Sequence, residues 1–392
     1  MGIKVGVVGA GQFAGSFIPL FKAHPDVSEV ILSDSVPEKR DAAAARFDIE
    51  RTSPSLDALL ETGVDAVAII TQPWLHGPQA LQALQAGKHV YCAVPMARSV
   101  DEVQAIVRAV EQTGLVYMTG ETSYYYPAAI YCREKHARGE FGHVVYGEGE
   151  YYHDWDHGLY TVNRNRGGER WHDHAGAPPM YYPTHSMSMI VSVTGAHATH
   201  ASCHGFVDRA IGTDTADGVY GEQANLYGNV FSNQTALFKM SDGSTARINE
   251  FRRVGHPGTV RMTLFGTQGS FEQNFGGAMW LTKDRKVAQR LDETLALGGV
   301  KNADDEFVGV SSVHPVQRLP REFAGLPNGH QGSHQFLVDD FVRACVERRQ
   351  PSNNVWMAAR YCVPGLIAHE SAKQGGALLE ILDFGAAPHQ PG

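Results

Sequence analysis

The first third of the chain alternates short apolar runs, rich in valine and isoleucine, with longer stretches in which apolar and polar residues recur at helical spacing. This alternation is typical of strands and helices that follow one another in a doubly wound parallel sheet. The pattern predicts strands at Ile3–Val8, Val30–Ser33, Ala66–Ile70, His89–Ala93 and Leu115–Met118.

Two of the helical stretches carry clear boundary signals. Ser99 and Glu102 form a capping box, which predicts a helix that continues to about Glu111. Gly87 stands where a helix that begins near His76 should stop. The spacing of these signals supports the alternating strand and helix assignment.

The pattern changes after Tyr126-Pro127, and it predicts a second domain of the α+β class with an antiparallel sheet. We therefore expect an α/β protein with domains at 1–122 and 123–392, in which the C-terminal helices can pack back on the first domain. The elements expected in the second domain are helices near Ala128–Arg138, Ser333–Glu347 and Val355–Gln374, and strands at Thr235–Met240 and Val260–Phe265.

Composition narrows the class of partner. The formal net charge of -9 over 392 residues is spread without a basic cluster, which disfavours nucleic acid and anionic membranes and favours a small molecule. We find no apolar run long enough for a membrane span and no secretory signal, so we expect a cytoplasmic protein. The 5 cysteines are scattered singly and are expected to be buried, reduced thiols.

A dinucleotide fingerprint follows the first strand and opens a helix. Its sequence is Gly9-Ala10-Gly11-Gln12-Phe13-Ala14, of the form G-x-G-x-x-A. In this motif Gly9 makes the tight turn, Gly11 lets the backbone approach a pyrophosphate, and Ala14 permits close packing of helix on strand. The N–H groups at the helix N-terminus attract the anion.

Asp34 ends the second strand about twenty residues beyond the fingerprint, where a carboxylate reaches the adenosine ribose hydroxyls. Its negative charge favours NAD, because a 2′-phosphate would be repelled. Lys39 and Arg40, one turn later, leave NADP as the alternative.

Two further motifs extend the pattern. Thr71-Gln72-Pro73-Trp74-Leu75-His76 follows a strand, and Ala86-Gly87-Lys88-His89-Val90 precedes the next. With the fingerprint and Asp34, they resemble the Gfo/Idh/MocA family of oxidoreductases, and the resemblance continues through Gly139-Glu140-Phe141-Gly142 over most of the chain. It implies NAD(P), sugar or cyclitol substrates, and dimers or tetramers built through a large open, mainly antiparallel sheet. By position it assigns to the nicotinamide half of the site Thr71, Trp74, His76, Val94 and Glu121. Gln12 and Phe13 of the fingerprint are further candidate cofactor-binding residues.

The chain departs from the family at two catalytic positions. The family's dehydrogenases carry Glu-Lys-Pro where this chain has Ala93-Val94-Pro95, so the lysine is missing. The family's Asp-x-x-x-His element maps onto His185, which lies ten residues before Gly195, with Tyr181 in place of the aspartate.

Three segments resemble glycoside hydrolase family 109. They are Tyr182-Pro183-Thr184-His185, the upstream Glu148-Gly149-Glu150-Tyr151-Tyr152-His153-Asp154, and the segment from Thr71 to His76. That branch retains NAD and cleaves glycosides through transient oxidation at C3, proton removal at C2, elimination, water addition and re-reduction. This chain departs from it in lacking a glutamate before Val94 and in carrying Thr122 where an asparagine is expected.

His185 is the first candidate for the catalytic base, because an imidazole accepts a hydroxyl proton near neutral pH. Tyr182 and Tyr151 are candidates for proton transfer and for hydrogen bonds to sugar hydroxyls. Arg170, His153 and Trp171 are candidate substrate-binding residues in the polar, aromatic stretch around them.

The imidazoles and carboxylates of residues 153–157 and 172–174 also raise the question of a divalent metal. Their spacings match no ligand motif, so we predict no metal.

We therefore expect an NAD-dependent oxidoreductase that transfers hydride between a ring carbinol of a sugar or glycoside and nicotinamide. The first alternative is a redox-neutral, NAD-dependent glycosidase or lyase. The second is a sensor that binds NAD or a sugar without catalysis.

Overall fold

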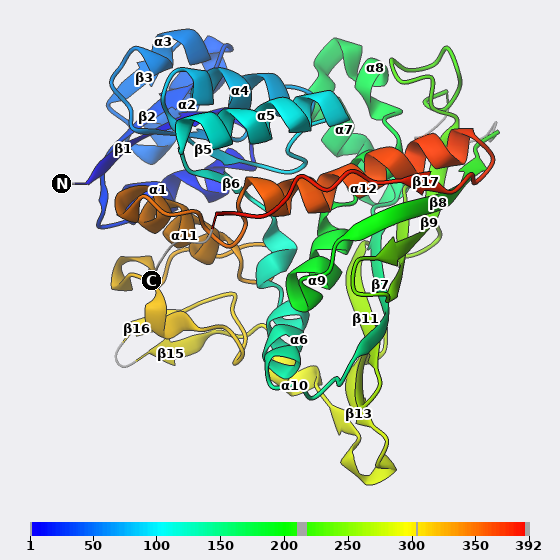
Figure 1. Cartoon of the computed structure of the whole chain (residues 1–392). Coiled ribbons are helices and arrows are strands. Elements are labelled where there is room, and N and C mark those ends of the chain that lie inside the picture. Colours follow the sequence, from blue (N-terminus) through cyan, green and yellow to red (C-terminus); the bar gives the residue numbers. More distant parts are fainter. Residues whose placement is uncertain (1, 210–217, 303–304, 389–392) are drawn as a thin grey trace. The chain divides into compact units, whose positions relative to one another are not determined.

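The computed structural model describes residues 2–209, 218–302 and 305–388 (Figure 1). By internal contacts the chain divides into two compact units. The first comprises Met1–Ile130, Glu293–Ala359 and Phe384–Gly392, and the second comprises Tyr131–Asp292 and Arg360–Asp383. The division at residue 122 expected from the sequence stays a prediction, and each unit is described by itself.

The first unit contains a six-stranded sheet in which every neighbouring pair is parallel. Its strand order, β3-β2-β1-β4-β5-β6, is the doubly wound order expected for a Rossmann domain, so this part of the fold prediction is confirmed. The strands are β1 (Ile3–Val8), β2 (Val27–Ser33), β3 (Arg51–Ser53), β4 (Ala66–Ile69), β5 (His89–Cys92) and β6 (Tyr117–Thr119). The sequence missed β3, because only one of its three residues is buried and no apolar run marks it.

Helices cover both faces of this sheet, with α4 beside α5 and α1 beside α11 (Figure 1). Val5 and Val7 of β1 share one apolar cluster with Phe17, with Phe21 of α1 and with Phe341 of α11. The helices are α1 (Ile18–Ala23), α2 (Pro37–Phe47), α3 (Leu56–Leu60), α4 (His76–Gln85), α5 (Val100–Thr113) and α11 (His334–Glu347).

The predicted helix boundaries are present. The Ser99 hydroxyl accepts the Glu102 N–H at 3.2 Å and caps α5, which ends at the left-handed Gly114. Gly87, with φ +75°, follows the end of α4.

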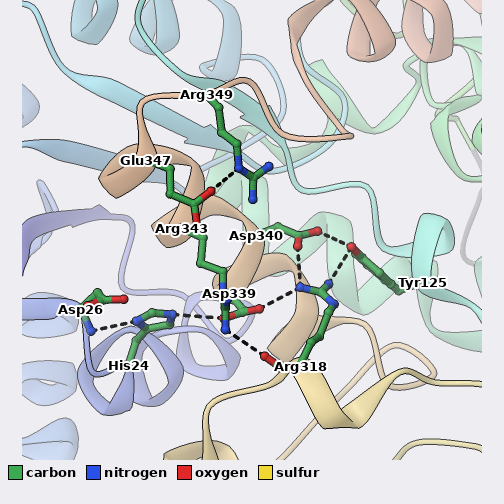
Figure 2. A network of polar contacts seen from close by, with 9 residues as sticks. All are labelled: His24, Asp26, Tyr125, Arg318, Asp339, Asp340, Arg343, Glu347 and Arg349. Atoms are coloured by element: carbon green, nitrogen blue, oxygen red, sulfur yellow. Dashed lines mark hydrogen bonds and ion pairs between the residues drawn. The ribbon is translucent and has the colours of Figure 1, made fainter. Parts of the chain in front are cut away.

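A buried network of charges holds α11 to the rest of the first unit (Figure 2). Asp339 is fully buried; Arg318 donates to it at 2.8 Å, Arg343 donates to it at 2.8 Å, and the His24 ring lies 3.4 Å away. Arg318 also donates to the hydroxyl of Tyr125 at 2.9 Å. A buried carboxylate is stable only when it is paired in this way, so the network specifies where α11 docks.

The second unit contains a mixed nine-stranded sheet, in the order β14-β13-β12-β11-β7-β10-β9-β8-β17. Among the strands that the structure describes in this sheet, β7 and β10 pair in parallel and the other neighbours pair antiparallel, so the prediction of a mainly antiparallel sheet is confirmed. The strands are β7 (Val144–Tyr152), β8 (Ala198–Val207), β9 (Phe231–Met240), β10 (Thr245–Phe251), β11 (Thr259–Gly266), β12 (Gly269–Asn274), β13 (Gly277–Thr282), β14 (Gln289–Arg290) and β17 (Leu379–Glu380).

Besides short 3-10 and π turns, the remaining described elements are a small two-stranded sheet and six α-helices, three of which begin in one unit and end in the other. They are β15 (Val300–Asn302), β16 (Asp305–Phe307), α6 (Pro127–Ala137), α7 (Tyr160–Gly167), α8 (Trp171–Ala175), α9 (Thr184–Thr194), α10 (Asp292–Leu295) and α12 (Val355–Lys373).

Two glycines of β7 let α9 pack very close to the sheet. A Cβ on Gly149 would lie 2.4 Å from the Ser186 carbonyl oxygen, and one on Gly147 would lie 3.0 Å from the Ile190 side chain. Side chains alternate along a strand, so Tyr151 points to the same face as these two glycines. The helix therefore rests on the glycines, and Tyr151 emerges beside its N-terminal turn.

All five cysteines are buried and reduced, as expected. Among the described residues, every helix is too short or too polar to span a bilayer. The cytoplasmic location stays a prediction.

Candidate active site

The dinucleotide loop lies between β1 and α1, in the first unit. Gly9 has φ +103°, and a Cβ there would lie 2.3 Å from the Ile70 carbonyl oxygen, so only glycine fits the turn. A Cβ on Gly11 would meet no atom within 4 Å, which leaves open space over the backbone. Ala14 is fully buried against the core. These residues fit a bound dinucleotide, since the turn is tight while the position above Gly11 is vacant of side chains.

Asp34, directly after β2, is held against this loop. One carboxylate oxygen accepts the Ala10 N–H at 2.8 Å, and the other accepts the Val36 N–H at 2.8 Å. The carboxylate is therefore fixed beside the fingerprint, as a ligand to ribose hydroxyls needs to be.

Two of the segments assigned to the nicotinamide half meet at His76, which is 1% exposed. Its Nδ1 lies 2.8 Å from the Pro95 carbonyl oxygen, and its Nε2 lies 3.2 Å from the carbonyl oxygen of Thr71. His76 thus joins the segment after β4 to the segment after β5, which contains Val94. The guanidinium carbon of Arg98 lies over the ring of Trp74, 5.9 Å from the ring centre.

Glu121 is fully buried at the end of the Rossmann strands. Its Oε1 accepts the Ser123 N–H at 2.9 Å and the Ser123 hydroxyl at 2.6 Å, and it caps the short helix Thr122–Tyr125. The cap makes Glu121 part of the local structure as well as a candidate for the cofactor site.

The three candidate catalytic residues meet in the second unit. The ring of His185, in the first turn of α9, lies 5.3 Å from that of Tyr151 and 5.3 Å from that of Tyr182. The two tyrosine rings are 5.8 Å apart, and His185 is only 6% exposed. A buried imidazole flanked by two phenols can move a proton to or from a bound hydroxyl.

His153, a predicted substrate-binding residue, joins the same group. Its Nδ1 lies 3.0 Å from the Tyr151 hydroxyl. Burial, with smaller contributions from Arg252, Arg166 and His185, lowers the pKa of His153 to about 4. His153 is therefore neutral near pH 7, and the Nδ1 of a neutral ring can accept a hydrogen bond from the Tyr151 hydroxyl and so orient the phenol.

The sequence did not identify Glu250 and Arg252, a buried ion pair beneath this group. Arg252 Nη2 lies 2.8 Å from Glu250 Oε2, and Glu250 Oε1 accepts the Ser186 hydroxyl at 2.5 Å. Burial raises the pKa of Glu250 to about 7, although Arg252, Ser186 and the charge of His185 act in the opposite direction. A carboxyl group that titrates near neutral pH therefore contacts the residue next to the candidate base.

Glu250 supplies an acidic group near His185, where the sequence has Tyr181 in the place of the family's aspartate. Tyr181 itself packs against His369, with ring centres 5.3 Å apart. A signal for Glu250 was present in the sequence: the buried alternation Ala246, Ile248, Glu250 places a charge on the apolar face of a strand, where it requires a partner.

The other two predicted substrate-binding residues lie outside the His185 group. Arg170 pairs with Asp173 at 2.6 Å, and 81% of its side chain is exposed. Trp171 is buried in a separate apolar cluster with Trp155 and Val219. Their roles toward a substrate stay predictions.

The histidine-rich stretch shows no metal centre in the described part of the chain, where no three His, Cys, Asp or Glu side chains are arranged to share an ion. His174 lies 3.1 Å from the Tyr227 hydroxyl, and His157 lies 3.7 Å from Asp154.

Comparison with known proteins finds a family model for the N-terminal part of the chain and relatives that align with nearly all of it. The Gfo/Idh/MocA family model, described as an oxidoreductase family with an NAD-binding Rossmann fold, matches residues 3–121. A glycosyl hydrolase family 109 protein of Streptomyces niveus is 26% identical over 97% of this chain and 77% of its own length. The 4-carboxy-2-hydroxymuconate-6-semialdehyde dehydrogenase of a Sphingobium species is 30% identical over 35% of this chain and 44% of its own.

Among solved structures, a levoglucosan dehydrogenase in complex with NADH and levoglucosan has a similar fold. Its TM-score is 0.75 at 18% identity, over 97% of this chain and 100% of that one. At this identity the likeness concerns the fold.

Proposed function

We propose that this chain transfers hydride between a ring carbinol of a sugar or glycoside and NAD. The proposal starts from its N-terminal domain, which matches the NAD-binding domain of the Gfo/Idh/MocA oxidoreductases. The observation that carries the proposal is the group of His185, Tyr151 and Tyr182, whose rings lie within 5.8 Å of one another in the second unit. The sugar class is taken from the relatives and from these hydroxyl-binding side chains.

Each residue has a definite task. Bound NAD supplies a hydride acceptor at its nicotinamide ring. His185 accepts the proton of the hydroxyl whose carbon gives up the hydride. The carboxylate of Glu250 favours the imidazolium that results, because opposite charges attract strongly away from water. Tyr151 and Tyr182 orient the neighbouring hydroxyls of the ring.

The direct test is NADH formation from NAD with a panel of sugars, polyols and glycosides. His185→Ala should lower kcat/KM by roughly 10²- to 10⁴-fold, the usual loss when a general base is removed. His143→Ala, at an exposed histidine of the same unit, is the matched control. Normal turnover in a folded His185→Ala protein would refute the assignment, and no turnover with any substrate would favour the sensor.

A redox-neutral glycosidase or lyase is the second candidate. It is favoured by the family 109 relative, which spans nearly the whole chain, and by Val94, which stands where dehydrogenases of the family carry lysine. It shares the first oxidation step with the dehydrogenase and differs in the later steps, in which the oxidised sugar loses a proton and its aglycone by elimination, adds water and is reduced again by the NADH formed in the first step.

Chromogenic glycosides separate these two candidates. Release of the aglycone without NADH accumulation would support the glycosidase, whereas steady NADH formation would support the dehydrogenase. Denaturing freshly purified protein and assaying the released NAD adds a second criterion, because a cofactor regenerated in every cycle has no need to leave.

A homodimer or homotetramer is also proposed, through the open sheet of the second unit. Light scattering of the purified protein tests it.

A further inference from the structure

The segment that leads into the first turn of α11, residues 328–335, has an unusual backbone. We refer to it as the His330 loop. His330, Gln331 and Gly332 have φ values of +46°, +54° and +86° in succession. Residues other than glycine rarely adopt positive φ values, because the backbone is then strained. This backbone strain persists only where the surrounding structure enforces it.

The loop contains a hydrogen-bonded pair of histidines. His334 Nε2 lies 2.9 Å from His330 Nδ1. His334 is 1% exposed, whereas His330 is exposed. Burial, together with the charge of His330, lowers the pKa of His334 to about 3, so His334 is neutral near pH 7.

This pair orients His330. His334 Nδ1 has no partner among the described residues, and a buried nitrogen without a partner is more tolerable as an acceptor than as an N–H donor. The proton of neutral His334 is therefore best placed on Nε2, from which it is donated to His330 Nδ1. The neutral His330 ring then carries its own proton on Nε2, at the far side from His334.

Unsatisfied polar atoms gather in this one loop. Within the described part of the chain, Asn328 Nδ2, Ser333 Oγ, His334 Nδ1 and Gln335 Oε1 are all buried without a hydrogen-bond partner. Folded proteins bury few such atoms, and each one calls for a ligand, a water or a functional reason. Four within eight consecutive residues point to a loop that is completed by something it binds.

The loop touches the dinucleotide fingerprint in the same unit. The ring of Phe13 lies 5.3 Å from that of His330 and 5.7 Å from that of His334. Phe13 is two residues beyond Gly11, the position with open space above its backbone. His330 therefore lies beside the dinucleotide loop, over which a pyrophosphate would bind.

We infer that His330 is a cofactor-binding residue that donates a hydrogen bond from Nε2 to the pyrophosphate of the dinucleotide, and that His334 is the positioning residue that holds it there. The inference rests on the proposed NAD-dependent function and adds an arm from a segment more than three hundred residues along the chain. The N-terminus of α11, which begins at His334, adds a dipole that favours the same anion.

The test is calorimetric binding of three ligands to the whole protein: NAD, ADP-ribose, which has the pyrophosphate but no nicotinamide, and adenosine, which has no phosphate. His330→Ala should weaken the binding of NAD and of ADP-ribose by about tenfold or more, as expected for loss of a hydrogen bond to a charged group. The binding of adenosine should be unchanged. His143→Ala is the control for an exposed histidine elsewhere.

The positioning role needs a readout other than stability. His334→Phe keeps an aromatic ring at this position and removes both imidazole nitrogens. It should therefore weaken ADP-ribose binding by a smaller factor than His330→Ala does. In the double variant the loss should equal that of His330→Ala alone, because His334 acts through His330.

Two results would count against the inference, and they are distinguishable from failure of the proposed function. Wild-type affinity for ADP-ribose in folded His330→Ala overturns the role of His330, and additive losses in the double variant overturn the positioning role. If the wild-type protein itself binds neither NAD nor ADP-ribose, the proposed function falls and takes the inference with it.

Discussion

The guanidinium carbon of Arg252 lies 4.9 Å from the centre of the Tyr151 ring, while its Nη2 pairs with Glu250 at 2.8 Å. One buried cation therefore contacts both a carboxylate and a candidate catalytic phenol. A cation over an aromatic ring is attracted by the electrons of that ring, and the attraction is stronger away from water. The stability of the second unit and the geometry of its candidate site thus depend on the same side chain.

Arg252→Met should destabilise the protein, and more at pH 8 than at pH 6. In the native protein the pKa of Glu250 is raised to about 7, whereas in the unfolded chain it is about 4.5. The free energy of unfolding therefore falls as pH rises from about 4.5 to 7, because the unfolded chain releases the proton more readily than the folded protein. Without the arginine that pKa rises further, and the loss continues above pH 7 at about 1.4 kcal/mol per pH unit.

Urea unfolding at the two pH values measures this difference, which should reach about 1.4 kcal/mol at most. Arg290→Met is the control, since its pair with Asp292 is largely exposed and screened by water, so it should contribute little to stability at either pH. Equal losses at pH 6 and pH 8 for Arg252→Met would contradict the coupling.

Tyr151→Phe should lower kcat by roughly a hundredfold, because it removes the hydroxyl bonded to His153 and keeps the ring beside Arg252. Its stability loss should stay near about 1 kcal/mol, the usual contribution of one hydrogen bond. Tyr146→Phe, on the opposite face of β7, loses a hydroxyl bonded to Glu148 and should leave kcat unchanged. If the two variants slow turnover equally, Tyr151 has no special role.

Gly11→Ala should fold normally and bind NAD at least about tenfold more weakly. A Cβ at this position meets no atom of the protein within 4 Å, so the only thing it can obstruct is the cofactor. The thermal midpoint and calorimetric titration with NAD check the two halves of the prediction. Gly255→Ala, which also meets nothing within 4 Å, is the matched control, and unchanged NAD affinity in Gly11→Ala would place the pyrophosphate elsewhere.

Buried neutral histidines should make the protein less stable in acid. Burial lowers the pKa of His369 to about 4, and its Nδ1 accepts the Gln234 N–H at 3.1 Å. Between about pH 6.5 and 4 the unfolded chain binds a proton that the folded protein excludes, so stability falls as pH falls through this window.

His369→Phe should remove about 1.4 kcal/mol per pH unit from the slope of unfolding free energy against pH in that window. His143→Phe, at an exposed position, should leave the slope as it is. Urea titrations from pH 4 to 8 measure both, and an unaltered slope in His369→Phe would mean that His369 is protonated in the folded protein.

Local features were predictable from the sequence. The Rossmann strands, the capping box at Ser99 and the turn at Gly9 depend on hydrophobic spacing and on residues a few positions apart, which one chain displays directly. The spacing back from Gly195 singled out His185, and the structure adds that this histidine lies in the first turn of α9, which ends at that glycine.

Boundaries of short elements were less predictable. The three residues of β3 carry too little periodicity to stand out, and β2 begins at Val27, before its fully apolar part. In both cases pairing with a neighbouring strand, rather than local sequence, sets the element.

The sequence by itself determined the dinucleotide fold and the acidic residue after its second strand, because hydrophobic spacing and a motif along the chain mark both of them. Only the tertiary structure decided that Glu250 and Arg252 lie beneath Tyr151 and that His330 lies beside Phe13. Alternation along a strand shows which face a charge occupies but not which partner waits there, and pairing across a hundred residues or more is fixed only when the sheet and its helices close around the core.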